Sequence, residues 1–323
     1  MTRVAAIDCG TNSIRLLVAD ADPSTGEFVE LDRRMEIVRL GQGVDRTGRL
    51  APEALERTFD ACRRYAAVIE EHGARRIRFV ATSASRDAEN RDDFVQGVRD
   101  ILGVEPEVIS GDQEAEFSFT GATKELAGRD HLAEPYLVVD IGGGSTEFVL
   151  GDAHVRAARS VDMGCVRMTE RHLVHDGVVS DPPTPGQIAA IRADIDAALD
   201  LAEESVPLTG AATLVGLAGT VTTVAAIALG LDAYDSTAIH HSRMSLEQVE
   251  EITGRLAAST HAERAAIGAM HPGRVDVITS GALILLSVMR RTGAREVVVS
   301  EHDILDGIAW KVAEAAEEPQ QGA

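Results

Sequence analysis

The sequence predicts an α/β protein built from two related halves. The first observation is a strand–turn–strand pattern that occurs twice, at residues 4–20 (VAAIDCGTNSIRLLVAD) and 136–151 (YLVVDIGGGSTEFVLG). The two copies match in register, because an aspartate, a glycine and a serine occupy corresponding places in both. The second observation is that helical and strand patterns alternate through the chain, which is typical of a partly parallel sheet.

The turn of the second copy has the composition of an anion-binding site. Asp140 ends a buried strand, and Gly142, Gly143 and Gly144 then reverse the chain. Glycine lacks a Cβ and tolerates positive φ, so backbone can approach a ligand and successive N–H groups can surround an anion. Glycine-rich hairpins are common and most bind nothing. Two matching copies, however, predict two phosphate-sized turns that face each other across a cleft.

Composition narrows the classes of partner. The 323 residues include 31 lysines and arginines against 52 aspartates and glutamates, a formal net charge of −21. Broad binding to nucleic acid or to an anionic membrane needs basic surface, so we expect neither partner. Any phosphate would have to be bound locally, through turn amides, a few arginines and a metal.

Three other features bear on the compartment. The three cysteines form no C-x-x-C pair and predict no disulfide framework. No signal-peptide pattern precedes the first strand, so we expect a cytoplasmic protein. The uncharged run 205–231 is long enough for a membrane span, but Pro207 and several glycines favour a buried strand, a turn and a helix.

The remaining elements follow from apolar spacing and capping signals. In the first half we predict a helix at 52–72, a strand at 77–81, a loop at 82–86, a charged helix to 102, a strand at 104–109 and a helix opening at 110–111. In the second half we predict strands at 213–217 and 296–299, helices beginning near Thr184, Ser245 and Thr260, a buried helix at 276–291 and a closing helix at 300–318 that packs on the first half. We place the domain junction within 121–134 and a disordered tail at 319–323.

Several side chains permit more than one interpretation. Cys9 and Arg15 have the C-x5-R spacing of cysteine phosphatases. Residues 14–18, however, alternate as in a returning strand, whereas that chemistry needs the arginine to enter a helix. We therefore interpret Cys9 as a packing residue. Glu114 lies early in a helix, where the helix dipole alone favours an acid. Arg86 is either a phosphate clamp or a surface arginine at a helix start. The histidines lack the spacing of a zinc site.

Taken together, six segments resemble the exopolyphosphatase/guanosine pentaphosphate phosphohydrolase (Ppx/GppA) family, which belongs to the actin, sugar-kinase and Hsp70 superfamily. They are VAAIDCGTNSIRLLVAD, VATSASRDAENRDDF, VISGDQEAEFSFTGA, LVVDIGGGSTEFVLG, GLAGTVTT and SEHDILDGIAW. They occur in family order from Val4 to about Trp310. The chain resembles the short, two-domain members.

The resemblance implies two actin-like (ASKHA, ribonuclease H-like) domains around a central cleft, with residues 1–128 plus 301–323 as domain I and 129–300 as domain II. It implies removal of a terminal phosphoryl group from inorganic polyphosphate or guanosine pentaphosphate, with Mg²⁺ or Mn²⁺ as cofactor. The implied catalytic residues are Glu114, as base, and Asp140; the phosphate-binding residues are Asn12, Ser13, Arg86, Gly142, Gly143, Gly144 and Ser145; and the metal ligands are Asp140 and Glu147.

The chain departs from the family pattern at two positions. Gln113 replaces the first acid of the family's SGxEEA segment, and Leu305 stands where the family often has an arginine. Any metal, proton or substrate contact made by those family side chains is therefore in doubt. We also expect a homodimer that acts in the stringent response.

Three functional hypotheses remain. The first is a hydrolase that removes terminal phosphates from polyphosphate, guanosine pentaphosphate or both by metal-assisted attack of water. The second is a non-catalytic sensor of phosphate chains or alarmones. The third is a kinase of the same superfamily, which the fold alone would permit.

Overall fold

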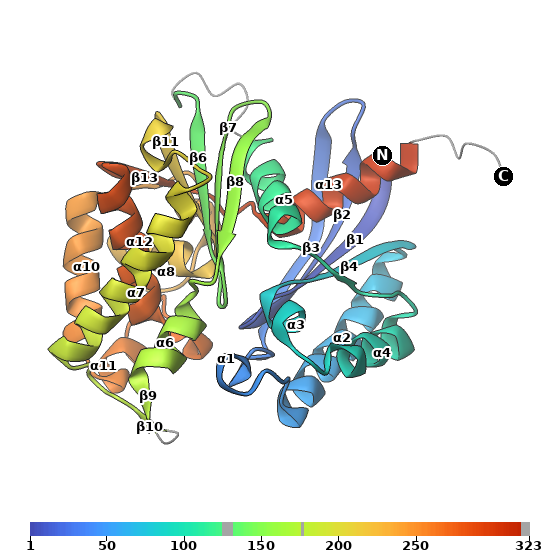
Figure 1. Cartoon of the computed structure of the whole chain (residues 1–323). Helices are drawn as coiled ribbons and strands as arrows, with labels where there is room; N and C mark the ends of the chain where they lie inside the picture. Colours follow the sequence, from blue (N-terminus) through green and yellow to red (C-terminus); the bar gives the residue numbers. More distant parts are fainter. Residues whose placement is uncertain (125–131, 176–177, 318–323) are drawn as a thin grey trace. The chain divides into compact units, whose positions relative to one another are not determined.

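The computed structural model describes residues 1–124, 132–175 and 178–317, and these form two compact units (Figure 1). Unit 1 comprises Met1–Gly121 and Ile304–Ala323, and unit 2 comprises Ala122–Asp303. Each unit contains its own mixed sheet and is described separately. Residues 125–131, part of the predicted domain junction at 121–134, and residues 318–323, which include the predicted tail at 319–323, lie outside the described residues.

Unit 1 is organised around a five-stranded sheet with the order β3-β2-β1-β4-β5. Its strands are β1 Thr2–Cys9, β2 Ser13–Asp22, β3 Glu27–Ile37, β4 Arg76–Ala81 and β5 Glu107–Val108. β1, β2 and β3 form an antiparallel meander, whereas β4 and β5 run parallel to β1. The predicted first hairpin is thus confirmed as β1 and β2.

Helices cover both faces of the sheet in unit 1. They are α1 Val44–Thr47, α2 Pro52–His72, α3 Ser83–Asp87, α4 Arg91–Leu102, α5 Gly111–Thr123 and α13 Ile304–Glu317. Side chains alternate along β1, so Val4 and Ala6 join the cluster that contains α13, while Ala5 and Ile7 join the cluster that contains α2 and α4. This two-sided burial explains why β1 reads as a continuous apolar run.

The C-terminal helix α13 completes unit 1, as predicted. It contacts β1, β2 and β4 and is drawn in red along these strands in Figure 1. Trp310 packs on Phe28 of β3 with ring centroids 5.1 Å apart. Arg33 of β3 pairs with Asp306, whose side chain is 1% exposed. The last segment of the chain therefore supplies core to its first strands.

Unit 2 repeats the sheet order of unit 1. Its strands are β6 Tyr136–Ile141, β7 Thr146–Gly151, β8 Val155–Val161, β11 Thr213–Leu217, β12 Arg243–Ser245 and β13 Glu296–Val299, in the order β12-β13-β11-β6-β7-β8. Reading from β8 to β13 gives an antiparallel meander followed by two parallel strands, as in β3-β2-β1-β4-β5. The duplication predicted from two hairpins therefore extends to five strands.

The helices of unit 2 form an apolar layer with one face of this sheet. They are α6 Cys165–Leu173, α7 Pro185–Glu203, α8 Ala218–Ala228, α9 Ser236–Ile239, α10 Leu246–Ala258, α11 His261–Ala265 and α12 Ile278–Thr292; a short ribbon, β9 Val174–His175 and β10 Val178–Val179, follows α6. The capping boxes predicted at Thr184, Ser245 and Thr260 are all present. α12 packs against α6, α7, α8 and α10, which explains why most of its residues are apolar and buried.

Three local predictions differ from the structure. Residues 82–86 were expected as a loop, but Ser83–Asp87 form the short helix α3. The strand expected at 104–109 is reduced to the two residues of β5. The helix expected from Asp276 begins at Ile278, after the short turn Pro272–Arg274. In the last two cases the pattern located the element but not its ends, which fray and are set by local hydrogen bonds. In the first case the helix is a single short turn with no side-chain cap to predict it.

Candidate active site

The first turn, between β1 and β2, is closed and supported by backbone hydrogen bonds. The amide of Gly10 donates to the carbonyl of Ser13 at 3.0 Å. The carbonyl of Asn12 accepts from the amides of Val38 and Arg39, at 3.1 and 2.8 Å. The segment after β3 therefore holds the turn from one side. Asn12 and Ser13, both predicted to bind phosphate, lie in this turn.

Arg86 and Glu114 are brought together within unit 1. Arg86 Nη1 donates to Glu114 Oε2 at 3.2 Å and to the carbonyl of Ile109 at 3.1 Å. Glu114 is 8% exposed, so its carboxylate is almost wholly removed from bulk water. The pair places the predicted phosphate clamp and the predicted base next to each other, a cation beside a buried carboxylate. The neighbouring Gln113 is instead the helix-start partner of Ser110.

The cysteine-phosphatase interpretation is not supported by the geometry of this turn. Arg15 lies opposite Asp8 on β2 and binds its carboxylate at 2.7 Å, so its guanidinium is used within the hairpin. Burial raises the pKa of the Cys9 thiol well above its ordinary value, so the thiol stays protonated and weakly nucleophilic. Cys9 lies in the apolar cluster with α2, as the packing interpretation predicted.

The second turn, between β6 and β7, has the same closure as the first. The amide of Gly142 donates to the carbonyl of Ser145 at 3.0 Å, matching Gly10 and Ser13 in atoms and in length. The start of α6 supports this turn from one side: Cys165 donates to the carbonyl of Gly142, and Val166 donates to that of Gly143. Gly142, Gly143, Gly144 and Ser145, all predicted to bind phosphate, form this turn.

Two buried carboxylates lie beside the second turn. Asp140 of β6 is directly opposite Glu147 of β7, and they are 6% and 1% exposed. Opposite residues of an antiparallel pair point to the same face. Because Val139 and Ile141 belong to the helical core, Asp140 points to the other face of the sheet. Ser160, opposite Glu147 on β8, donates to its Oε1 at 2.7 Å.

The two hairpins differ in charge at this point. In unit 1 the aspartate, Asp8, is opposite an arginine, whereas in unit 2 Asp140 is opposite Glu147. Adjacent buried carboxylates repel each other unless a cation or a proton intervenes. One or two carboxylates, completed by waters and substrate oxygens, are the usual protein ligands of Mg²⁺. The side chains present therefore fit a divalent cation, although no group of three or more potential metal ligands occurs within the described residues.

A profile of the Ppx/GppA phosphatase family matches residues 17–314. The chain belongs to this family. It is 50% identical to exopolyphosphatase 2 of Mycobacterium tuberculosis, over 97% of this chain and 99% of that one. It is 30% identical to the guanosine-5'-triphosphate,3'-diphosphate pyrophosphatase of Aeromonas hydrophila, over 95% of this chain and 58% of that one. A crystal structure described as an exopolyphosphatase-like protein matches at a TM-score of 0.92 with 44% identity, covering 98% of this chain and all of that one.

Membership of the Ppx/GppA family confirms the resemblance, the two actin-like α/β folds and the prediction of a hydrolase. The individual site residues remain predictions, because the comparisons do not test them. Leu305, where the family often has an arginine, is 1% exposed and belongs to the apolar cluster of α13. It therefore serves as a packing residue here.

The residues that support the second turn carry no recognisable sequence signal. Gly164 lies so close to it that a Cβ there would be 2.3 Å from the carbonyl carbon of Gly143. Arg167 of α6 donates through Nε to the carbonyl of Gly144 at 2.7 Å. α6 has no side-chain N-cap, so the usual sequence signal for a helix start is missing. The contacts also span about twenty residues, which no local pattern reports.

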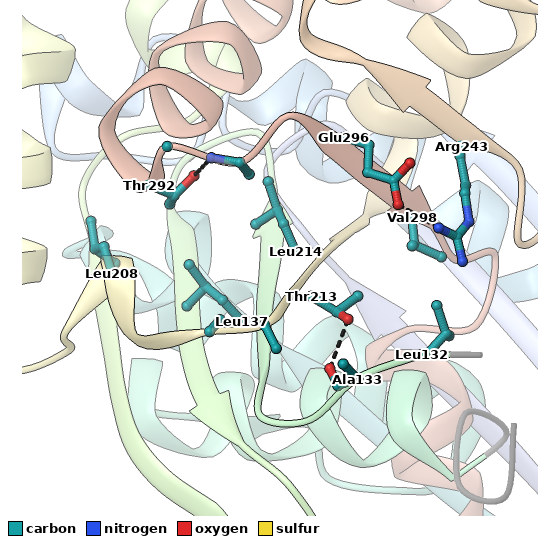
Figure 2. A pocket seen from close by; sticks show the side chains of 14 residues that line it. Leu132, Ala133, Leu137, Leu208, Thr213, Leu214, Arg243, Thr292, Glu296 and Val298 are labelled. Atoms are coloured by element: carbon teal, nitrogen blue, oxygen red, sulfur yellow. Dashed lines mark hydrogen bonds and ion pairs between the residues drawn. The ribbon is translucent and has the colours of Figure 1, made fainter. Parts of the chain in front are cut away.

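A cavity of about 340 Å³ lies elsewhere in unit 2 (Figure 2). It is lined by leucines such as Leu137 and Leu214 and by the ion-paired Arg243 and Glu296. It is at the amino ends of β6, β11 and β13, whereas Asp140 lies near the carboxyl end of β6. None of the predicted site residues lines it. Ligands of open α/β sheets bind at the carboxyl ends of strands, so this cavity is not our candidate site.

The described residues contain no membrane-spanning helix. Within 1–124, 132–175 and 178–317, none is both long and apolar enough to cross a bilayer. The uncharged run that raised this question forms the turn Leu208–Gly210, the strand β11 and the helix α8, as the sequence favoured.

Proposed function

We propose that this chain removes the terminal phosphoryl group from inorganic polyphosphate, from guanosine pentaphosphate to give the tetraphosphate, or from both. The observation that carries the proposal is the pair of matching turns, each closed by a Gly–Ser hydrogen bond of 3.0 Å. The similarity to proteins named for these two activities supports it. We place polyphosphate first, because the more similar of the two relatives is named for it.

The turns would bind phosphate oxygens through their backbone. In the second turn, the α6 amides engage the carbonyls of Gly142 and Gly143. A trans peptide directs its N–H opposite to its C=O, so the amides of Gly143 and Gly144 point away from α6. Amides fixed in this way stabilise negative charge without reorganising during the reaction, which is the main requirement of phosphoryl transfer.

Glu114 would act as the general base. Its carboxylate is buried, and the adjacent Arg86 holds it in one orientation. From there it accepts a proton from a water that attacks the terminal phosphorus, and Arg86 binds phosphate oxygens. No serine or cysteine nucleophile is needed, which agrees with the protonated, buried state of Cys9.

Asp140 and Glu147 would hold a divalent cation, Mg²⁺ or Mn²⁺. Such a cation, when bound, neutralises phosphate charge and polarises the phosphoryl oxygens. The residues themselves supply two opposed carboxylates, one of them oriented by Ser160.

The proposal has four further parts. The two units correspond to domains I and II, the chain forms a homodimer, it is located in the cytoplasm, and it acts in the stringent response. Each follows from the family resemblance or from composition. Sedimentation analysis of the purified chain would test the homodimer. The non-catalytic sensor finds no support in the comparisons.

Phosphate release tests the proposed function. The chain would be incubated with short polyphosphate, long polyphosphate or guanosine pentaphosphate, each with Mg²⁺ or with EDTA. We expect Mg²⁺-dependent release into water from at least one of them. Binding without release would favour the sensor. Transfer of the terminal phosphoryl group to a supplied acceptor alcohol, giving a phosphate ester and no inorganic phosphate, would favour a kinase.

A further inference from the structure

The two turns are supported by equivalent contacts at their second residues, Thr11 and Gly143. The carbonyl of Thr11 in the first turn accepts from the amide of Gly41, and its counterpart Gly143 accepts from Val166. These supports are equivalent backbone contacts. They are accompanied by equally close packing, because a Cβ on Gly41 would meet the Thr11 side chain and a Cβ on Gly164 would meet Gly143.

The next peptide breaks the equivalence. In the first turn, the carbonyl of Asn12 is held by two backbone amides, those of Val38 and Arg39. In the second turn, its counterpart Gly144 is held by the side chain of Arg167, through Nε at 2.7 Å. In the second turn, a guanidinium group thus replaces the two backbone amides as the hydrogen-bond donor. The arginine side chain is 12% exposed, so it is packed in place rather than free in solvent.

The orientation of this peptide determines where an amide points. The peptide between Gly144 and Ser145 is trans, because the cis peptides of the described chain are Glu134–Pro135 and Asp181–Pro182. With the carbonyl of Gly144 directed at Arg167, the amide of Ser145 must point the opposite way. The amides of Gly143, Gly144 and Ser145 donate to no backbone carbonyl within the described residues. They are therefore available to an anion.

We propose that Arg167 is a positioning residue for the phosphate-binding turn of unit 2. It does not contact the reacting atoms. It fixes the Gly144–Ser145 peptide so that three successive amides converge on one phosphate. The inference rests on the proposed function, because it names a further residue of the same site. A polyglycine turn has little preference of its own, so a charge-assisted hydrogen bond is an effective way to select one conformation.

Replacement of Arg167 separates positioning from general stability. Arg167→Met keeps most of the packing but has no donor, and we expect the KM for tripolyphosphate to rise about tenfold or more, with kcat changed much less. Arg167→Lys and Arg167→Gln keep a donor and should recover part of the loss. A KM within twofold of wild type in folded Arg167→Met protein would overturn the inference.

Two matched controls accompany this experiment. Arg171→Met makes the same change one turn later on α6, where the arginine pairs with Asp194 at 2.8 Å. Asp162→Asn removes an ion-pair partner 3.8 Å from Arg167 and does not alter the donor to Gly144. Both should leave KM within about twofold of wild type. An equal rise in KM in Arg171→Met would show that any loss of charge on α6 suffices, and would overturn the inference.

A second measurement does not depend on activity. The amide of Gly142 closes the turn, so its hydrogen exchange in substrate-free protein reports the order of the turn. We expect about tenfold faster exchange in Arg167→Met and no change in Arg171→Met. If wild type released no phosphate, the proposed function would fail, yet the exchange result would still decide the role of Arg167. Unchanged exchange in Arg167→Met would contradict it.

Discussion

Glu114 combines burial with a partner that fixes its direction. A carboxylate that is 8% exposed and 3.2 Å from a guanidinium is retained at a cost in solvation, which function would explain better than stability. The sequence left a plain alternative, in which acids merely favour the first turn of a helix. That alternative suits Glu116, whose side chain is 56% exposed and pairs with Lys311. It does not explain a buried acid.

We expect Glu114→Gln to lower kcat by about 10²–10⁴-fold, because a base that acts in the transition state contributes to that extent. Binding of a phosphate chain, measured by calorimetry, should be largely kept, since glutamine has the same shape. Glu116→Gln, on the same helix, is the matched control and should retain wild-type turnover. Near-normal turnover of Glu114→Gln would remove it from the mechanism.

Asp140 and Glu147 show why the two turns cannot be chemically equivalent. The sequence revealed Asp8 and Asp140 as counterparts, but not that their opposite residues differ in sign. To see that difference, one must know which residues of the two strands are opposite each other. This register is set by the length of each turn, which the apolar pattern of the strands does not fix. The Asp8–Arg15 pair is internally neutral. In the second hairpin two carboxylates are opposite each other, which is why we propose the cation there.

We expect activity to require Mg²⁺ or Mn²⁺ and to be removed reversibly by EDTA. Asp140→Asn and Glu147→Gln should each raise the Mg²⁺ concentration that gives half-maximal activity, because each removes one ligand charge. A titration of phosphate release against free Mg²⁺ measures this shift. Full activity in EDTA, or unchanged titration curves in both variants, would mean that the carboxylates only stabilise the hairpin.

At the scale of elements, α6 is a part of the site that contributes through backbone contact. Gly164 just before it would place a Cβ 2.3 Å from the carbonyl carbon of Gly143, and neither backbone can move without disturbing the turn. Gly254 in α10 has nothing within 4 Å of its Cβ position. Substitution of these two glycines by alanine should therefore change the free energy of unfolding in opposite directions.

We expect Gly164→Ala to lower the free energy of unfolding by about 1–3 kcal/mol through overpacking. Gly254→Ala should raise it by about 0.5–1 kcal/mol, because alanine is the better helix former. Urea denaturation of the purified variants measures both changes. Gly164→Ala protein as stable as wild type would show that α6 can withdraw from the turn.

The elements that could be predicted are those with local signals. The hairpins, α2 with its terminal Gly73, and three capping boxes follow from turn and cap chemistry within a few residues. The edge strands β3 and β8 were missed. Neither has the alternation of one buried face: β3 contains no fully buried residue, and β8 contains only Val161. Their existence depends on pairing with β2 and β7, which is not encoded in their own pattern.

At the scale of the whole molecule, unit 1 is built from both ends of the chain, with unit 2 between them in the sequence. The last described helix belongs to the first unit, where Trp310 and Leu305 complete a core begun by Val4. The capping and motif signals predicted this return, since the closing segment was recognised as part of a family pattern. The predicted boundaries at 128/129 and 300/301 stay a prediction, while the contacts of the described residues divide the chain at 121/122 and 303/304.

The net charge of −21 sets the response of the whole molecule to salt. A polyanionic substrate approaching so acidic a protein is repelled at long range, and salt screens that repulsion over a Debye length of about 10 Å at 0.1 M. Proteins that bind polyanions through an extended basic surface behave oppositely, losing about 10³–10⁵ in affinity between 50 and 200 mM salt. We therefore expect kcat/KM for long polyphosphate, at constant free Mg²⁺, to hold steady or rise over that range of KCl. Tripolyphosphate, with fewer charges, should respond less and serves as the control. A tenfold or greater fall for the long chain alone would reveal a continuous basic track along the protein, and binding by local turns would then be an insufficient account.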